Sequence, residues 1–172
     1  MKIVRNILPG LLILCPYVIY YLLDKELMDF FGPMILIIIL LAILNIISAL
    51  SWKGFGAEKS LALWGMIMKI ALVPAYLFIF AMGIAFFIGG IFFIPVIFGA
   101  AMMIILLVIF DVMLLVSTSS YSVKAAYLLS KRGTLSKGAA VVLSILSFFF
   151  VIDVIVSVVI FVYSRKKVVY YY

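Results

Sequence analysis

Residues 70–110 read IALVPAYLFIFAMGIAFFIGGIFFIPVIFGAAMMIILLVIF, and no charged side chain interrupts this stretch between Lys69 and Asp111. An α-helix of about 20 apolar residues crosses the ~30 Å hydrocarbon core of a bilayer. The stretch is therefore long enough to cross twice, and it must turn back on itself. Gly89-Gly90 followed by Pro95 supplies the break. We expect an antiparallel helical hairpin with an apolar turn.

The composition of the whole chain agrees with a membrane protein. Of its 172 residues 70% are apolar and 11% are charged, whereas a soluble domain is about half apolar and a quarter charged. The apolar runs are continuous rather than alternating, which favours helices over strands. We predict an all-α membrane protein with a single domain over residues 1–172, a bundle of about five transmembrane helices with short loops. The predicted spans are 6–23, 31–50, 61–84, 91–119 and 138–163.

The residue types that are missing exclude several kinds of site. Cys15 is the single cysteine and histidine is absent, which excludes zinc and haem sites built on histidine or paired cysteines, and Ser-His or Cys-His nucleophile pairs. We expect no metal and no cofactor. The net charge of +7 comes from basic residues beside apolar runs. This pattern favours the lipid bilayer over nucleic acid as the partner.

The basic residues also predict an orientation. If the N-terminus lies in the cytoplasm, eight basic residues lie inside and four lie outside, which agrees with the positive-inside rule. The inside residues are Lys2, Arg5, Lys53, Lys59, Lys124, Lys131, Arg132 and Lys137, and the outside residues are Lys25, Arg165, Lys166 and Lys167. The basic segment SRKKVVYYY conflicts with this orientation, because five spans place it outside. Four aromatic residues beside the inner loops are expected to form an interfacial belt: Trp52, Trp64, Tyr121 and Tyr127.

Three ionisable residues lie within the predicted spans: Lys69, Asp111 and Asp153. A charge at the centre of a span costs about 2.5–3.5 kcal/mol, so each needs a partner or water. Counted from Ser60 and Tyr121, both Lys69 and Asp111 lie about 13–15 Å from the inner boundary. Since their spans are joined by a short hairpin, we expect these two residues to pair. Asp153 is expected to lie deeper and to lack a cation.

Helical spacing gives each of these charges a polar neighbour on its own face. The candidate polar site within the membrane contains Lys69, Asp111, Asp153, Asn45, Tyr76, Thr118 and Ser157. Two interpretations remain open. In one, Lys69 and Asp111 form a salt bridge that fixes helix register, and Asp153 is bonded to Ser157 and a neighbouring helix. In the other, the charges handle protons or cations at the centre of the bundle.

Three segments carry a resemblance to a known family: LWGMIMKIALVPAYLFIF, FDVMLLVSTSSYSV and SFFFVIDVIVSVVIF. The chain resembles uncharacterised small polytopic membrane proteins of gut-type Firmicutes over roughly its C-terminal two-thirds. The residues that match are Lys69, Pro74, Tyr76, Asp111, Ser117, Phe150 and Asp153. The resemblance implies a bacterial plasma membrane and supplies no activity.

Three classes of function follow from these observations. The favoured class is a non-catalytic accessory, immunity or assembly component that acts through helix contacts, as a homo-oligomer or with a membrane-protein partner. The alternative is a small proton- or cation-coupled transporter or channel subunit that uses Asp111, Asp153 and Lys69. An intramembrane aspartyl protease is disfavoured, because Phe110 and Ile152 stand where that motif has a glycine. We therefore expect no enzymatic activity.

Overall fold

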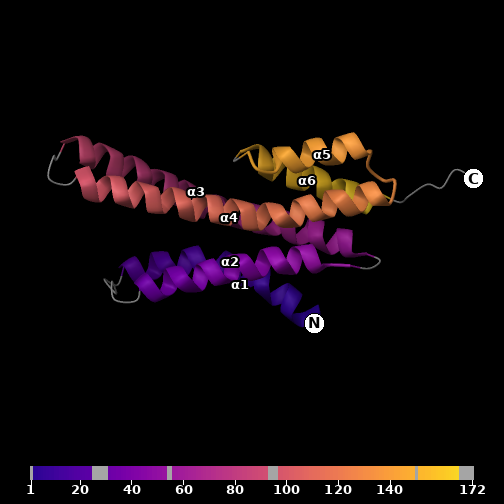
Figure 1. The fold of residues 1–172 in the computed structure, drawn as a ribbon, viewed down its shortest axis with the longest axis horizontal. Helices are drawn as coiled ribbons and strands as arrows, with labels where there is room; N and C mark the ends of the chain where they lie inside the picture. Colours follow the sequence, from indigo (N-terminus) through magenta and orange to yellow (C-terminus); the bar gives the residue numbers. More distant parts are fainter. Residues whose placement is uncertain (1, 25–30, 54–55, 93–96, 150, 167–172) are drawn as a thin grey trace, which may run out of the picture.

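The computed structural model describes residues 2–24, 31–53, 56–92, 97–149 and 151–166. Within these ranges the fold is all-helical, without a strand, as the sequence predicted. The helices are α1 (Lys2–Asp24), α2 (Phe31–Ser51), α3 (Ala57–Phe92), α4 (Ile97–Lys131), α5 (Lys137–Leu146) and α6 (Ile152–Arg165). They lie along one long axis, with α1 and α2 on one side of α4 and with α5 and α6 on the other (Figure 1).

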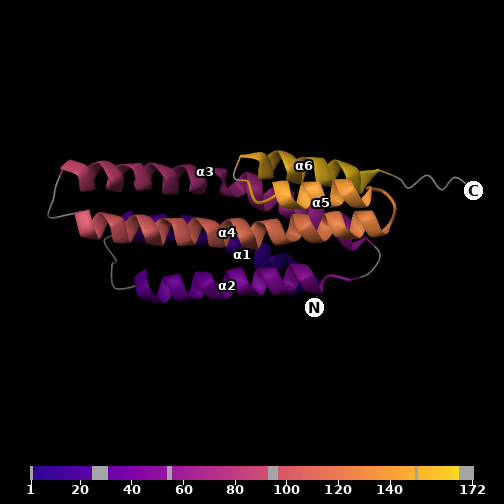
Figure 2. The same ribbon diagram turned by 45° about the horizontal axis from the view of Figure 1, so that its top comes forward.

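Helices α3 and α4 form the longest packed pair and run side by side in both ribbon views (Figures 1 and 2). Gly65 lets them approach closely: a Cβ atom there would lie 3.1 Å from Ser122 Oγ and 3.4 Å from Tyr121 Cβ. The predicted break at Gly89-Gly90 is wrong, because α3 continues through both glycines to Phe92. A glycine in a helix interior costs only about 1 kcal/mol relative to alanine, and here two of them do not end a helix of 36 residues. Pro95 lies outside the described residues.

By length and composition, two of the described helices can cross a membrane: Ala57–Phe92 and Phe98–Lys131. Only 17% and 11% of their most apolar windows are buried inside the protein. A core helix of a soluble domain would bury most of such a window. The apolar surface of α3 and α4 therefore faces outward, where Phe87, Phe92 and Phe98 are 61%, 77% and 86% exposed.

The fifth predicted span is not one helix. Residues 138–163 are divided into α5 and α6, and the chain turns at Ser147 and Phe148. The N–H groups of Phe148 and Phe149 donate to the carbonyls three residues earlier, so the last turn of α5 tightens before the helix ends. Helices α5 and α6 then lie side by side and cover one half of the α3–α4 pair (Figures 1 and 2).

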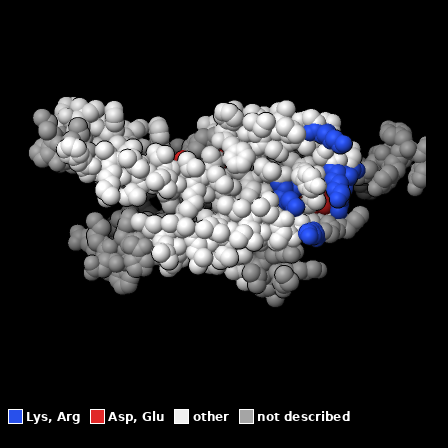
Figure 3. Space-filling view, viewed as in Figure 1, with Lys and Arg blue, Asp and Glu red and all other residues white. Residues whose placement is uncertain are grey.

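Because α6 doubles back on α5, it ends at the same end of the molecule as α4 (Figure 1). We call this end, where α2, α4 and α6 finish and α3 and α5 begin, the basic end. Its described basic residues are Lys53, Lys59, Lys124, Lys131, Arg132, Lys137, Arg165 and Lys166 (Figure 3). The prediction that Arg165 and Lys166 lie opposite the other basic residues is therefore wrong. Lys25 and Lys167 lie outside the described residues.

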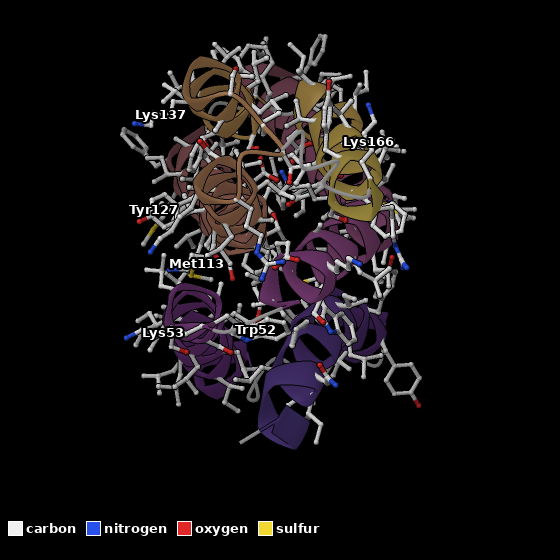
Figure 4. All side chains as sticks on the ribbon, turned by 90° about the vertical axis from the view of Figure 1, so that its right-hand side faces the viewer. Trp52, Lys53, Met113, Tyr127, Lys137 and Lys166 are labelled. Atoms are coloured by element: carbon white, nitrogen blue, oxygen red, sulfur yellow. The ribbon has the colours of Figure 1, made fainter. Side chains whose placement is uncertain are left out.

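Viewed end on, the basic end has its cations on the outside. Lys53, Lys137 and Lys166 point away from the bundle, while the side chain of Trp52 lies between the helices (Figure 4). Trp52 is 6% exposed and Tyr121 is fully buried. These two aromatic residues are core residues, so their predicted place in an interfacial belt is wrong.

Candidate functional site

Lys69 is the centre of a buried polar cluster, which we call the Lys69 cluster and which also contains Ser119, Ser147 and Asp153. The Lys69 Nζ atom lies 3.2 Å from Asp153 Oδ2. It donates hydrogen bonds to Ser119 Oγ at 3.3 Å and to the Ser147 carbonyl at 3.2 Å. An ammonium group has three N–H donors, and two of them make these hydrogen bonds. The contact with Asp153 is an ion pair, and neither carboxylate oxygen of Asp153 makes a hydrogen bond within the described residues. Lys69 is completely buried and Asp153 is 1% exposed.

The cluster forms where two short helices end. Ser147 is the C-cap of α5, and Asp153 lies in the first turn of α6. A cation is favourable at the C-terminus of a helix and a carboxylate at the N-terminus, because both complement the helix dipole. The Ser147 carbonyl also accepts a hydrogen bond of 2.5 Å from Ser119 Oγ on α4. Lys69 and Ser119 thus satisfy backbone that the turn leaves outside helical hydrogen bonding.

The predicted pairing of Lys69 with Asp111 is wrong, since the ion-pair partner of Lys69 is Asp153. The depth estimate failed because it placed the inner boundary at Tyr121, whereas α4 continues to Lys131. Gly65 packs against Tyr121, which brings Lys69 to the level of Ser119. Asp111 precedes Ser119 by eight residues on α4, so it lies about 12 Å from the level of Lys69 and Ser119 along the helix axis. It is Asp111, and not Asp153, that lacks a cation within the described residues.

Asp111 and Tyr76 border an open groove of about 370 Å³ between α3 and α4. Its walls are otherwise apolar, and the lining residues are Tyr76, Ile79, Phe80, Gly83, Ile84, Phe87, Ile104, Leu107, Val108 and Asp111. Asp111 Oδ1 is buried and makes no hydrogen bond within the described part of the chain. A buried carboxylate oxygen without a donor is costly. Asp153 also lacks a hydrogen-bond donor but is paired with Lys69, whereas Asp111 has no ion-pair partner within the described residues and borders the groove, so a donor from a ligand or partner would stabilise it.

Two other predicted site residues do not reach the carboxylates. The Thr118 hydroxyl donates to the Leu115 carbonyl at 3.1 Å. The Ser157 hydroxyl donates to the Val154 carbonyl at 2.7 Å. Both bonds stay within one turn of their own helix, as is usual for hydroxyl side chains in apolar helices. The predicted bond between Asp153 and Ser157 is therefore wrong.

Asn45 belongs to a second cluster. Its Nδ2 atom donates to the carbonyls of Leu8 at 3.1 Å and Leu41 at 2.9 Å, and its Oδ1 atom accepts from the Tyr121 hydroxyl at 2.9 Å. The cluster joins α1, α2 and α4, and both Asn45 and Tyr121 are fully buried. Tyr121, Ser119 and Ser147 were not among the site residues predicted from the sequence. The run Ser117 to Ser120 in an apolar helix was the signal that could have pointed to α4.

We expect Asn45→Leu to destabilise the protein by about 1–3 kcal/mol, because the Tyr121 hydroxyl then loses its buried acceptor. The variant Asn45→Leu with Tyr121→Phe should recover part of that loss, since no orphaned hydroxyl remains. Thermal unfolding of the purified protein in detergent measures both. Unchanged stability of the Asn45→Leu variant would show that this cluster does not stabilise the packing of α1, α2 and α4.

These features define an all-helical protein with two helices able to cross a membrane and an ion pair buried in its interior. The sequence model of a family of unknown function, DUF6652, matches residues 10–166, and the chain belongs to this family. No curated protein and no solved structure matches the chain.

Proposed function

We propose that this chain is an integral protein of the bacterial plasma membrane. In this arrangement α1 to α4 cross the bilayer, and the α5–α6 hairpin enters and leaves from the cytoplasmic side. The collection of basic residues at one end supports this orientation by the positive-inside rule, and in this orientation the start of α1 and the end of α6 face the cytoplasm. A turn at membrane depth is tolerated where its backbone is buried in protein. The buried Ser147, bonded to Lys69 and Ser119, meets that condition.

We further propose that the protein is a non-catalytic accessory, immunity or assembly component that acts through helix contacts. The observation that carries this proposal is the burial of the ion pair in the Lys69 cluster. Lys69 is paired with Asp153 and hydrogen-bonded to Ser119 and Ser147, and both charges are at most 1% exposed. This ion pair joins α6 to α3 and has almost no contact with solvent, which supports a structural role over ion transport.

Proteoliposomes that contain only this protein are therefore expected to show no proton or cation flux above that of protein-free liposomes. A pH-sensitive dye and a potassium-sensitive dye, each read under an imposed gradient, measure this. Flux that disappears in Asp153→Asn would contradict the proposal, because the Lys69 cluster would then lie on an ion pathway.

A transporter remains the second candidate, and Asp111 is the observation that favours it. Its Oδ1 atom is buried without a hydrogen bond beside an open groove. The same flux measurement separates the two functions, since transport through this groove would be lost in Asp111→Asn and retained in Asp153→Asn.

A further inference from the structure

Helix α6 occupies only one half of the groove between α3 and α4. It contacts both helices, and its N-terminal turn carries Asp153, which pairs with Lys69 on α3. Beyond this turn α5 and α6 end, while α3 and α4 continue together toward the opposite end (Figure 2). Tyr76 follows Lys69 by seven residues on the same face of α3. The vacant half of the groove is thus a direct continuation of the half that α6 fills.

The vacant half of the groove is large enough to bind one face of a short helical segment. It extends along α3 from Tyr76 to Phe87, about 16 Å or three helical turns. Its volume of about 370 Å³ accommodates the side-chain ridge of a helix that packs against two others. The only carboxylate in its described lining is Asp111, at the end nearer to the Lys69 cluster. A third helix seated here would need to bring a donor to that carboxylate.

We propose that the vacant half of the α3–α4 groove binds a transmembrane helix of a different protein, and that a lysine or arginine within the apolar span of that helix pairs with Asp111. The contact would repeat, with the charges exchanged between helices, the way α6 is fixed by Asp153 and Lys69. This inference rests on the proposed function, since it names the kind of partner through which an accessory component would act.

Two other occupants fit the groove less well. A second copy of this chain offers no unpaired cation from its apolar segments, because residues 6–24, 31–52 and 60–123 contain a single basic residue, Lys69, which is already engaged. A lipid acyl chain would fill the apolar part, but it brings no hydrogen-bond donor to Asp111 Oδ1. Within the membrane, packing complementarity and hydrogen bonds between helices drive association, and a partner helix supplies both.

The test uses a synthetic apolar helix of about 20 residues with one lysine at the level of Asp111. A matched peptide has leucine at that position. Each carries a fluorophore and is reconstituted in lipid vesicles with the full-length labelled protein, and energy transfer reports association. The lysine peptide should bind the wild-type protein about tenfold more tightly than the leucine peptide, and Asp111→Asn should remove that preference.

Two glycines on α3 supply matched variants. A Cβ atom at Gly83 or at Gly89 would meet no other atom within 4 Å, so both positions accept a larger side chain. Gly83 lines the groove and Gly89 does not. Gly83→Leu should abolish binding of the lysine peptide by filling the groove, whereas Gly89→Leu should bind as the wild type does.

Equal binding of the two peptides, or binding that survives Gly83→Leu, would overturn the proposal. Binding of a spin-labelled fatty amine tests whether the groove is instead a lipid site. If Gly83→Leu releases this amine while neither peptide binds the wild-type protein, the groove is a lipid site and the proposal is wrong. These outcomes are independent of the flux measurement, so failure of the partner site is distinguishable from failure of the proposed function.

Discussion

Lys69→Met is expected to lower the free energy of unfolding by about 3–5 kcal/mol, the usual cost of removing one member of a buried ion pair. Methionine is close to lysine in length and apolar, so the loss comes mainly from the charge. Asp153 would be left buried without its cation, and the Ser147 carbonyl would lose one of its two donors. Because Asp153 is in the first turn of α6, the contacts of α6 with α3 should loosen first. Thermal unfolding in detergent measures the change.

The partner of Lys69 is identified by two double variants. Lys69→Met with Asp153→Leu should recover much of the lost stability, since replacing both members of a buried pair by apolar side chains is often nearly neutral. Lys69→Met with Asp111→Leu is the matched control, and relative to Asp111→Leu alone it should lose as much stability as Lys69→Met loses relative to the wild type. Recovery in the Asp111 variant and none in the Asp153 variant would contradict the geometry of the Lys69 cluster.

The local structure that the sequence predicted correctly depends on short-range chemistry. Gly133 has a φ of +75°, which favours glycine, and Ser136 is the N-cap of α5, with its side chain accepting from the Ala139 N–H. Both features agree with local signals in SKRGTLSK, where a glycine is expected to end one helix and either Thr134 or Ser136 to cap the next. The antiparallel packing of α3 and α4 was predicted for a similar reason: the short connection between two long apolar segments leaves little choice.

The features that the sequence could not predict depend on contacts between distant segments. Residues 147–151 contain no glycine or proline, so nothing local marks the end of α5. The turn is stabilised by Lys69, which is 78 residues away from Ser147 in the chain. The ion pair between Glu58 and Arg132 at the basic end is equally non-local, and Glu58 is 2% exposed there. Helical spacing predicts on which face of its own helix a residue lies, but it does not predict how neighbouring helices are aligned along their axes.

The second large expected effect concerns the thiol accessibility of the end of α6, which follows from the proposed re-entrant α5–α6 hairpin. A cysteine at Lys166 should be protected from an impermeant thiol reagent whenever cysteines at Lys53 and Lys131 are protected, because all three positions are exposed and lie at the basic end. Cys15→Ser provides the background. A cysteine at Asp24, at the opposite end of α1, should have the opposite accessibility. The difference is expected to be all or none, since in the proposed arrangement a bilayer separates the two ends.

Labelling in intact cells and in inverted membrane vesicles is therefore the most direct test that α5 and α6 form a hairpin held at its turn by Lys69. The proposed orientation predicts that cysteines at positions 53, 131 and 166 are protected in cells and labelled in inverted vesicles, while a cysteine at position 24 is labelled in cells. Labelling of position 166 in intact cells, with positions 53 and 131 still protected, would mean that residues 137–165 cross the membrane once. That result would contradict the hairpin and the place of Lys69 within it.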